Sequence, residues 1–197
     1  PFKLSVFPFN YIQDLENPVI FKKIINSIEI LIEKYGFEFL KLDFLYAPHY
    51  LKRYKDSSIP DQILKNFLST IRKKYPHIHI NLCGCPLGLG IGNCDSMRIS
   101  ADNFSPYFDN IWPINQIFHS HRLIQLENNL ESRLNTNKYW LLDPDVFTCR
   151  KSTGLSKNQI IKLGNLIKKA YGLYFLGDDL TKLSNQEIDT YVKPLFR

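Results

Sequence analysis

The sequence predicts an α/β fold in which a parallel sheet curves into a (βα)8-type barrel. Segments with the spacing of amphipathic helices alternate with short apolar runs along the 197 residues. The runs are almost continuously apolar, which is typical of strands buried on both faces of a parallel sheet. Polar residues stand where these runs end, at Asp43, Cys83, Asp102, Asp143 and Asp178. Barrels with an active site at the carboxyl ends of their strands show this pattern.

Two helices are predicted in the first half of the chain. Asn17-Pro18 is a helix start with proline at the first helical position. Apolar side chains then recur at helical spacing from Ile20 to Tyr35, and Gly36 ends the segment. The same spacing over residues 63–71 predicts a second helix.

Three helices are predicted in the second half. A polar-apolar stretch from about Ile117 to Leu134 has helical character. Ser156 with Gln159 forms a capping box that begins a helix through Ala170, and Ser184 with Glu187 forms another before the last helix.

The apolar runs between these helices predict five strands, and a sixth is left open at residues 4–9. They lie around residues 39–45, at 77–83, near Met97, at 139–142 and at 173–176. No Gly-x-Gly-x-x-Gly follows the first strand, which disfavours a dinucleotide-binding fold.

Composition indicates one globular domain over residues 1–197. Hydrophobic residues make up 44% and aromatic residues 14%, enough for a sizeable core. The net charge is +6, but the lysines are scattered over predicted helix faces, so we expect no nucleic-acid partner. No apolar run reaches the length of a membrane span, and no leader-like segment begins the chain, so we expect no membrane partner and a cytoplasmic protein.

The cysteines and histidines leave minor alternatives open. Cys83-Gly84-Cys85 is too tightly spaced for a zinc knuckle, and a disulfide from Cys94 to either cysteine is left open beside the default of reduced cytoplasmic thiols. His77 and His79 form a His-x-His pattern, which some metal-dependent barrel hydrolases use to bind their metal. They begin their strand, however, and so lie away from the catalytic rim.

Two aspartates carry the chemistry that the pattern indicates. Lys41 and Asp43 are two residues apart on one strand and point to the same side. Arg98 and Asp102 are four apart and share a face if the chain stays extended between them. Alternate strands of a barrel fill the same layer, so Asp43 and Asp102 are predicted to meet across one pocket. Two carboxyl groups in one pocket suit glycoside hydrolysis; taken singly, each aspartate suits a structural role.

Five motifs in order make the chain resemble the α-galactosidase family of retaining glycosidases, glycoside hydrolase family 36 of clan D. They are colinear from about residue 14 to residue 182: Lys-Leu-Asp-Phe-Leu, Cys-Gly-Cys-Pro-Leu, Asp-Ser-Met-Arg-Ile-Ser-Ala-Asp, Trp-Leu-Leu-Asp-Pro-Asp-Val-Phe and Gly-Asp-Asp-Leu. The resemblance implies a partial TIM (βα)8 barrel, about strands 4 to 8 with their helices.

The resemblance also implies roles for residues. Asp43 matches the family's nucleophile and Asp102 its general acid/base. Lys41 and Arg98 match residues that contact sugar hydroxyls, and Cys83 matches a cysteine lining the sugar subsite. Four further acids are interpreted as supporting residues whose ordinary role is hydrogen bonding to loops: Asp143, Asp145, Asp178 and Asp179.

The implied function is hydrolysis of terminal α-linked galactose from an oligosaccharide or glycoside by double displacement, with no metal or organic cofactor. Asp102 must hold a proton in the first step, which apolar or anionic neighbours favour and Arg98 opposes. Since a closed barrel takes about 250 residues, we expect the chain to be a fragment. The alternatives are an incomplete barrel or subunit without independent activity, completed by the missing N-terminal half, and a relative that transfers galactose to another sugar.

Overall fold

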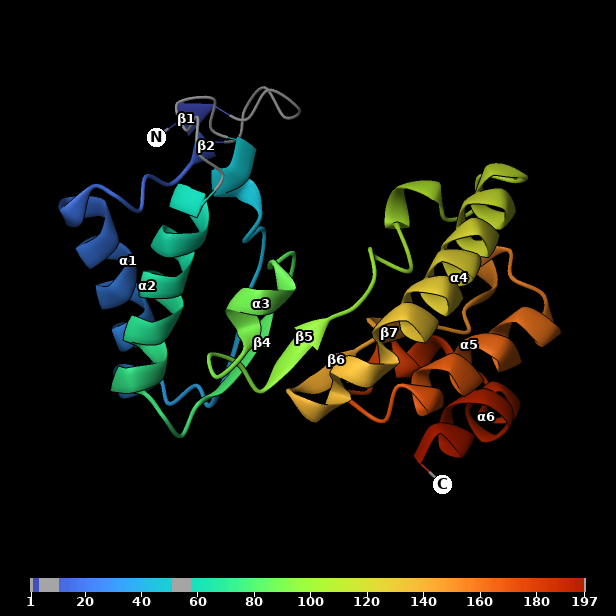
Figure 1. Cartoon of the computed structure of the whole chain (residues 1–197). Coiled ribbons are helices and arrows are strands. Elements are labelled where there is room, and N and C mark those ends of the chain that lie inside the picture. The colour runs from blue at the N-terminus through green and yellow to red at the C-terminus, as the bar shows by residue number, and fades with distance from the viewer. Residues whose placement is uncertain (1, 4–10, 51–57, 197) are drawn as a thin grey trace. The chain divides into compact units, whose positions relative to one another are not determined.

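The computed structural model describes residues 2–3, 11–50 and 58–196 (Figure 1). It divides into two compact units, Pro1–Met97 and Arg98–Arg197, which we describe separately. The single domain expected over residues 1–197 stays a prediction. Within the described ranges, none of the helices combines the length and apolarity needed to cross a bilayer.

The helices of unit 1 follow the predicted periodicity. Helix α1 (Pro18–Glu29) begins where the Asn17 side chain accepts hydrogen bonds from Val19 and Ile20 N–H, and it continues as a π-helix over Ile30–Lys34. Helix α2 is Ser58–Lys74 and packs beside α1, with the Phe21 and Phe67 rings 6.0 Å apart (Figure 1). A short helix α3 (Leu87–Gly90) and a 3-10 turn (Ala47–Tyr50) lie in the loops.

The strands that were predicted in the first half of the chain are parallel, and β3 and β4 are shorter than predicted. β3 (Phe39–Leu42) pairs with β4 (His79–Leu82), and β4 pairs with β5 (Ser96–Arg98). Apolar residues of α2 and β4 form the core, and Leu64, Leu68, Ile80 and Leu82 are at most 1% exposed. β1 (Phe2–Lys3) and β2 (Tyr11–Ile12) pair antiparallel, and the strand left open at residues 4–9 lies outside the described residues.

The helices of unit 2 carry the two predicted capping boxes. Helix α4 (Ile114–Arg133) continues as a 3-10 turn over Leu134–Lys138. Ser156 and Gln159 cap helix α5 (Lys157–Lys169), and Ser184 and Glu187 cap helix α6 (Asn185–Glu187). A π-helix (Ile188–Val192) and a 3-10 turn (Lys193–Phe196) follow α6, and further 3-10 turns occupy Pro106–Phe108, Lys151–Thr153 and Leu180–Lys182.

Unit 2 has one short strand that the sequence did not predict, over Val146–Phe147. β6 (Leu141–Asp143) ends at Pro144, and Asp145 takes a left-handed backbone conformation (φ 72°) before β7 (Val146–Phe147) begins. β7 pairs in parallel with β8 (Phe175–Leu176). The strand predicted over 139–142 is therefore displaced toward Asp143, because a strand ends where its hydrogen-bonded ladder ends rather than where its apolar run does. Leu126, Leu142, Phe147 and Ile167 lie in the core.

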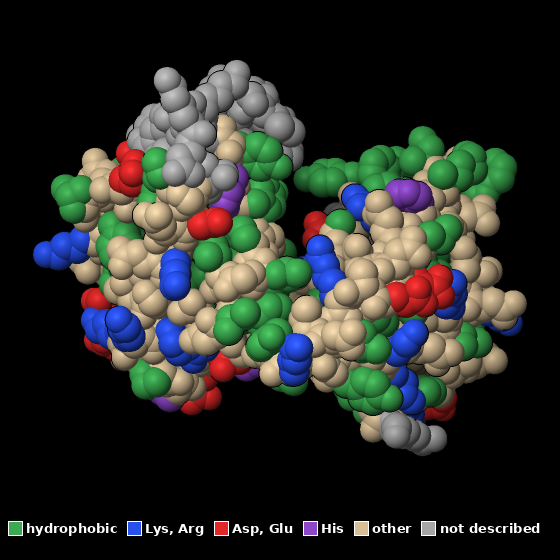
Figure 2. Space-filling model, in the orientation of Figure 1, with side chains coloured by type: hydrophobic (Ala, Val, Ile, Leu, Met, Phe, Trp, Pro, Cys, Tyr) green, Lys and Arg blue, Asp and Glu red, His purple; other side chains and the backbone are tan. Residues whose placement is uncertain are grey.

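Surface charge is mixed. On the face drawn in Figure 2, Lys and Arg side chains are interspersed with Asp, Glu and apolar ones in place of one basic patch. This arrangement agrees with the scattered lysines of the sequence.

Candidate active site

Asp43 and Cys83 lie at one edge of the unit 1 sheet. Asp43 directly follows β3, and Cys83 directly follows β4. Cys83 N–H donates to Leu42 O (2.8 Å), and Leu45 N–H donates to Cys83 O (3.3 Å), so the two strand ends are joined by their backbones. The Asp43 carboxylate accepts from Phe44 N–H (2.6 Å), and the side chains of Lys41 and Asp43 are exposed. Unit 1 thus presents a carboxylate and a lysine to solvent beside a thiol.

Gly84, which lies between Cys83 and Cys85, allows the Tyr46 ring to approach the backbone closely. Gly84 has φ +65°, and a Cβ on it would lie 2.4 Å from Tyr46 Cδ1. The Tyr46 ring therefore packs on the Gly84 backbone, which holds the loop after β3 against the loop after β4. Phe44 also has a positive φ, 56°, directly after Asp43.

The cysteines are free thiols, so the disulfide left open for Cys94 is not formed. Burial raises the pKa of Cys85 to about 12. Burial likewise raises the pKa of Cys94 to about 12. Neutral thiols of this kind are poor nucleophiles.

His79, one of the two histidines of the His-x-His pattern, makes contacts within the sheet. Its Nε2 lies 2.8 Å from Ser96 Oγ, and its ring stacks on Phe39.

Arg98 connects two carboxylates in unit 2. Its Nη2 lies 2.9 Å from Asp102 Oδ1 and 2.5 Å from Asp145 Oδ2. Asp145 also accepts from Asn103 N–H (2.7 Å), and Asp143 accepts from Asp145 N–H (2.8 Å). Because these bonds join the segment after β5 to the segment after β6, they fix Arg98 at the carboxyl ends of both strands.

The three charges of this cluster differ in exposure. The side chains of Arg98 and Asp145 are 3% and 11% exposed, whereas Asp102 is 81% exposed. Burial raises the pKa of Asp145 above its ordinary value, against the lowering effect of Arg98 and of the Asn103 N–H. Apolar or anionic neighbours were expected around Asp102; its side chain is largely exposed, and it shares Arg98 with the anionic Asp145.

The contact between Arg98 and Asp102 has a different cause from the one predicted. An extended chain would carry residues four apart about 13 Å along the strand, on one face but out of reach. The chain instead bends at Ser100 and Ala101, which returns Asp102 to the guanidinium.

Asp178 and Asp179 follow β8 and bind nearby loops. Asp178 accepts from the Thr148 hydroxyl, from Cys149 N–H (2.6 Å) and from Arg150 Nη1 (3.0 Å). Asp179 accepts from Thr181 N–H (3.1 Å) and lies 3.3 Å from Lys182 Nζ. Both therefore shape the loops beyond the strand ends.

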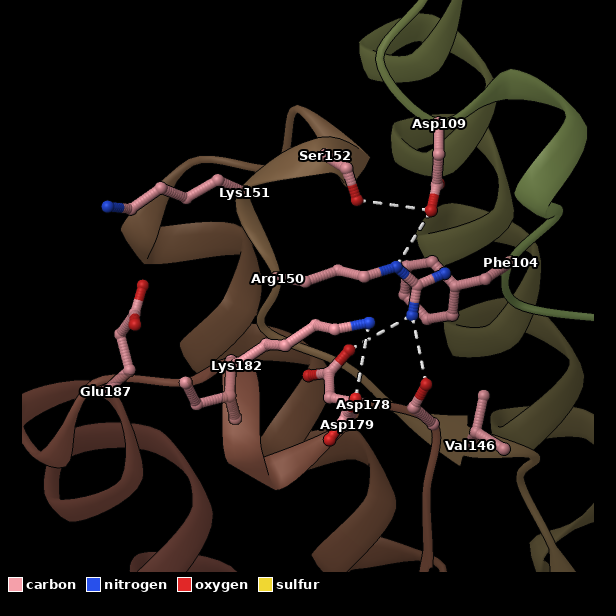
Figure 3. Close-up of a pocket in the computed structure, with 12 residues that line it drawn as sticks. Phe104, Asp109, Val146, Arg150, Lys151, Ser152, Asp178, Asp179, Lys182 and Glu187 are labelled. Carbon is pink, nitrogen blue, oxygen red and sulfur yellow. Dashed lines mark hydrogen bonds and ion pairs between the residues drawn. The ribbon is translucent and has the colours of Figure 1, made fainter.

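A pocket of about 730 Å³ at the carboxyl ends of β7 and β8 includes residues that the sequence analysis missed (Figure 3). Arg150 Nε donates to Asp109 Oδ2 (2.8 Å), and Arg150 Nη1 donates to Gly177 O (3.1 Å). The Arg150 guanidinium lies 5.9 Å from the centre of the Phe104 ring. The position of Arg150 shortly after an apolar strand was the one sequence signal for it; its carboxylate partners are distant in the chain.

Comparison with known proteins places the fold. No protein-family model matches the chain. The structure of an α-galactosidase from Thermus thermophilus in complex with stachyose is 19% identical with a TM-score of 0.71, covering 93% of this chain and 39% of that one. The same enzyme in complex with p-nitrophenyl α-D-galactopyranoside is 22% identical with a TM-score of 0.73, covering 93% and 37%.

These likenesses are at the level of fold. The chain spans about two-fifths of the length of the α-galactosidase structures that it matches. It therefore has an α/β fold, with parallel strands and helices, that is similar to a portion of a glycosidase barrel.

Proposed function

We propose that this chain is the C-terminal half of the catalytic barrel of a retaining α-galactosidase, which hydrolyses terminal α-linked galactose. One observation carries the proposal: Asp43 and Asp102 are both exposed carboxylates that come shortly after strands of parallel sheet, within a fold similar to part of an α-galactosidase. The order of the five motifs supports the same function.

The reaction proceeds by double displacement. The Asp43 carboxylate attacks the anomeric carbon and forms an ester to the sugar, while Asp102 gives its proton to the departing glycosidic oxygen. Asp102, now a carboxylate, takes a proton from water, and the resulting hydroxide breaks the ester and releases galactose with retained configuration. This sequence requires the two carboxyl groups to lie about 5–5.5 Å apart.

Cationic and thiol side chains support each step. Lys41 lies on the strand that Asp43 directly follows, and it contacts the hydroxyls of the bound galactose. Arg98 binds the carboxyl groups of Asp102 (2.9 Å) and Asp145 (2.5 Å) and so holds Asp102 in place. Cys83 borders the sugar subsite beside Asp43.

The roles proposed for Asp43 and Asp102 can be tested with variants of each residue, assayed in the presence of azide as an external nucleophile. Asp102→Ala should hydrolyse p-nitrophenyl α-galactoside at least a hundredfold more slowly. Azide needs no base, so it should attack the galactosyl ester and give α-galactosyl azide. Asp43→Gly lacks the nucleophile, so azide should attack directly and give the inverted β-galactosyl azide. Asp189→Asn, an exposed aspartate paired with Lys193, is the matched control and should keep full activity.

The products are distinguished by the coupling constant of their anomeric proton in NMR spectra. Inverted galactose from the unaltered chain, or unchanged turnover by both variants, would contradict the proposal.

The alternative is an incomplete barrel without independent activity. The observation in its favour is that the chain spans about two-fifths of the matching α-galactosidase structures. A chain that is folded by circular dichroism yet releases no p-nitrophenol supports the alternative. Turnover that appears only after a segment carrying the earlier barrel strands is added would assign the activity to the assembled barrel.

A further inference from the structure

Helix α4 of unit 2 carries apolar side chains on two opposite sides. One side lies in the core of the unit, where Leu126 and Leu130 are 0% exposed. The other side carries Ile114, Ile117 and Ile124, whose exposed fractions are 48%, 66% and 53%. A helix on the surface of a folded unit ordinarily turns polar residues toward water. The exposed side of α4 therefore has the composition of a contact surface.

The exposed side chains have the spacing of a coiled-coil seam. They follow one another at intervals of three, four and three residues, at Ile114, Ile117, His121 and Ile124. Residues spaced in this way lie along one line of a helix, and His121 is exposed as the isoleucines are. A seam of this kind is typical of a helix that packs against a second helix.

Further apolar side chains extend the seam at the N-terminal end of α4. Trp112, shortly before the helix, is 77% exposed, and Tyr107 is 85% exposed. The 3-10 turn that carries Tyr107 is fastened to α4, because the centres of the Phe108 and Phe118 rings lie 4.6 Å apart. Figure 2 shows hydrophobic side chains at the upper right of the view, where α4 begins in Figure 1. The apolar α4 surface consists of six residues: Tyr107, Ile111, Trp112, Ile114, Ile117 and Ile124.

The apolar α4 surface is large enough for one side of a stable protein–protein interface. The exposed fractions of its six side chains together correspond to roughly 700 Å². Monomeric proteins rarely keep a contiguous apolar patch larger than a few hundred square ångströms in water. A stable complex covers about 800 Å² on each partner, so burial of this surface against an equal one would suffice for a dimer.

Charged side chains beside the apolar α4 surface are engaged within unit 2. Arg122 donates to Gln125 Oε1 (2.8 Å), and its guanidinium lies 4.9 Å from the centre of the Phe118 ring. Glu127 binds Lys162 of α5 (2.6 Å). A strongly charged partner would have to compete with these bonds. A second copy of the chain presents an equally apolar surface and leaves them intact.

We infer that the apolar α4 surface is the interface of a two-fold symmetric dimer of this chain. A two-fold axis allows one patch to pack against its own copy. Antiparallel packing of the two α4 helices brings Ile117 of each copy against Ile124 of the other and places His121 near the axis. The inference concerns assembly and is independent of the proposed function.

Sedimentation equilibrium of the full chain tests the dimer. Interfaces of this size bind with micromolar or tighter affinity, so we expect a dimer at about 50 μM. Ile117→Glu should raise the dissociation constant at least a hundredfold, because the symmetric interface would then bury two unpaired carboxylates. Ile161→Glu is the matched control, since Ile161 lies on α5 outside the surface and is 48% exposed, and it should leave the constant unchanged. Circular dichroism checks that both variants fold.

Cross-linking tests the antiparallel arrangement. In His121→Cys the two new thiols should lie near the axis and form an intermolecular disulfide when diamide oxidises them. In Glu131→Cys the corresponding thiols of an antiparallel dimer should lie about 30 Å apart and stay reduced. The unaltered chain, which has cysteines of its own, gives the background.

Three results would overturn the inference. One is a chain that stays monomeric at about 50 μM, and another is dissociation by Ile161→Glu to the same extent as by Ile117→Glu. The third is a segment with the earlier barrel strands that displaces the second copy yet does not bind Ile117→Glu, because the surface would then belong to the assembled barrel. None of these measurements depends on hydrolysis, so loss of the proposed function would leave the dimer to be decided by itself.

Discussion

Each unit contains an arginine–aspartate pair of the same length. Arg72 Nη2 lies 2.5 Å from Asp95 Oδ2 in unit 1, and Arg98 Nη2 lies 2.5 Å from Asp145 Oδ2 in unit 2. Burial raises the pKa of Asp95, but the Ile80 N–H bond and Arg72 outweigh it and leave that pKa below its ordinary value. Burial prevails at Asp145, whose pKa lies above its ordinary value.

The exposure of the two aspartate side chains explains why their pKa values shift in opposite directions although the two arginine–aspartate distances are equal. The Asp95 side chain is 40% exposed and keeps water, whereas Asp145 is 11% exposed and has lost most of it. An ionised carboxyl that loses its water recovers only part of that cost from a nearby cation. Forming the ion pair of Arg98 and Asp145 in unit 2 therefore costs more free energy of desolvation than forming that of Arg72 and Asp95. Removing one partner of the unit 2 pair also destabilises the fold more.

The largest difference between the pairs should appear when each arginine is removed. Arg98→Met leaves Asp145 buried without its cation, and we expect a loss of about 3–5 kcal/mol in the unfolding free energy of unit 2. Arg72→Met should cost unit 1 about 1 kcal/mol, because Asp95 can return to water. Hydrogen exchange of amides in each unit measures both values.

The double variant Arg98→Met with Asp145→Asn serves as the control for that experiment. It removes both charges and should recover part of the loss. Equal costs for Arg98→Met and Arg72→Met would show that burial does not separate the pairs.

A smaller difference in stability is expected between alanine variants of two glycines, one in each unit, because different atoms lie next to them. A Cβ on Gly172 would lie 1.9 Å from the backbone oxygen of Leu142 in β6, and one on Gly84 would meet the Tyr46 ring. A strand carbonyl cannot move without breaking its ladder, so Gly172→Ala should cost about 3 kcal/mol and Gly84→Ala about 2 kcal/mol. Urea denaturation measures both.

Gly36→Ala is the matched control for backbone strain alone. Gly36 has φ +70° with nothing within 4 Å of its Cβ position, so the change should cost about 1 kcal/mol. If Gly84→Ala costs no more than Gly36→Ala, the Tyr46 contact contributes nothing to stability.

The smallest effect is the pH dependence of stability, which should have opposite signs in the two units. Folded Asp95 releases its proton before the unfolded chain does, so its contribution is present above about pH 3.9 and is lost as the pH falls through its lowered pKa. Folded Asp145 keeps its proton longer, so its contribution is present below about pH 3.9 and is lost as the pH rises through its raised pKa.

Carboxyl ¹³C titrations by NMR measure the two groups directly. Asp95 should titrate below the ordinary range and Asp145 above it. In Asp145→Asn, the decline of unit 2 stability above about pH 3.9 should disappear. Titration of both carboxyls on the same side of the ordinary value would contradict the comparison.

Local signals in the sequence predicted the helices well because their causes are local. Asn17 and Ser156 lie within three residues of the N–H groups that they cap. Strand ends were predicted less well, since the partner strand decides where a ladder stops. The apolar run that includes Trp140 suggested a strand, yet the β6 ladder begins only at Leu141.

Much of the candidate active site could not be predicted from residues that are close together in the sequence. Arg98 with Asp145, and Arg150 with Asp109, are more than forty residues apart in the chain. Arg98 was singled out by its motif, but the sharing of its charge between Asp102 and Asp145 depends on the bend after β5 and on the break at Pro144. Neither the pocket nor the role of Arg150 in its wall could be inferred from spacing.

The sequence by itself determined the alternation of helices and parallel strands, the helix caps, and the acids at the strand ends, because backbone geometry and apolar periodicity act over a few residues. Only the tertiary structure decided which carboxyls are buried, which cations they meet and where a cavity opens. Those properties depend on how much water each group loses when distant segments pack, and the free-energy cost of that loss is large enough to reverse the effect of a neighbouring charge.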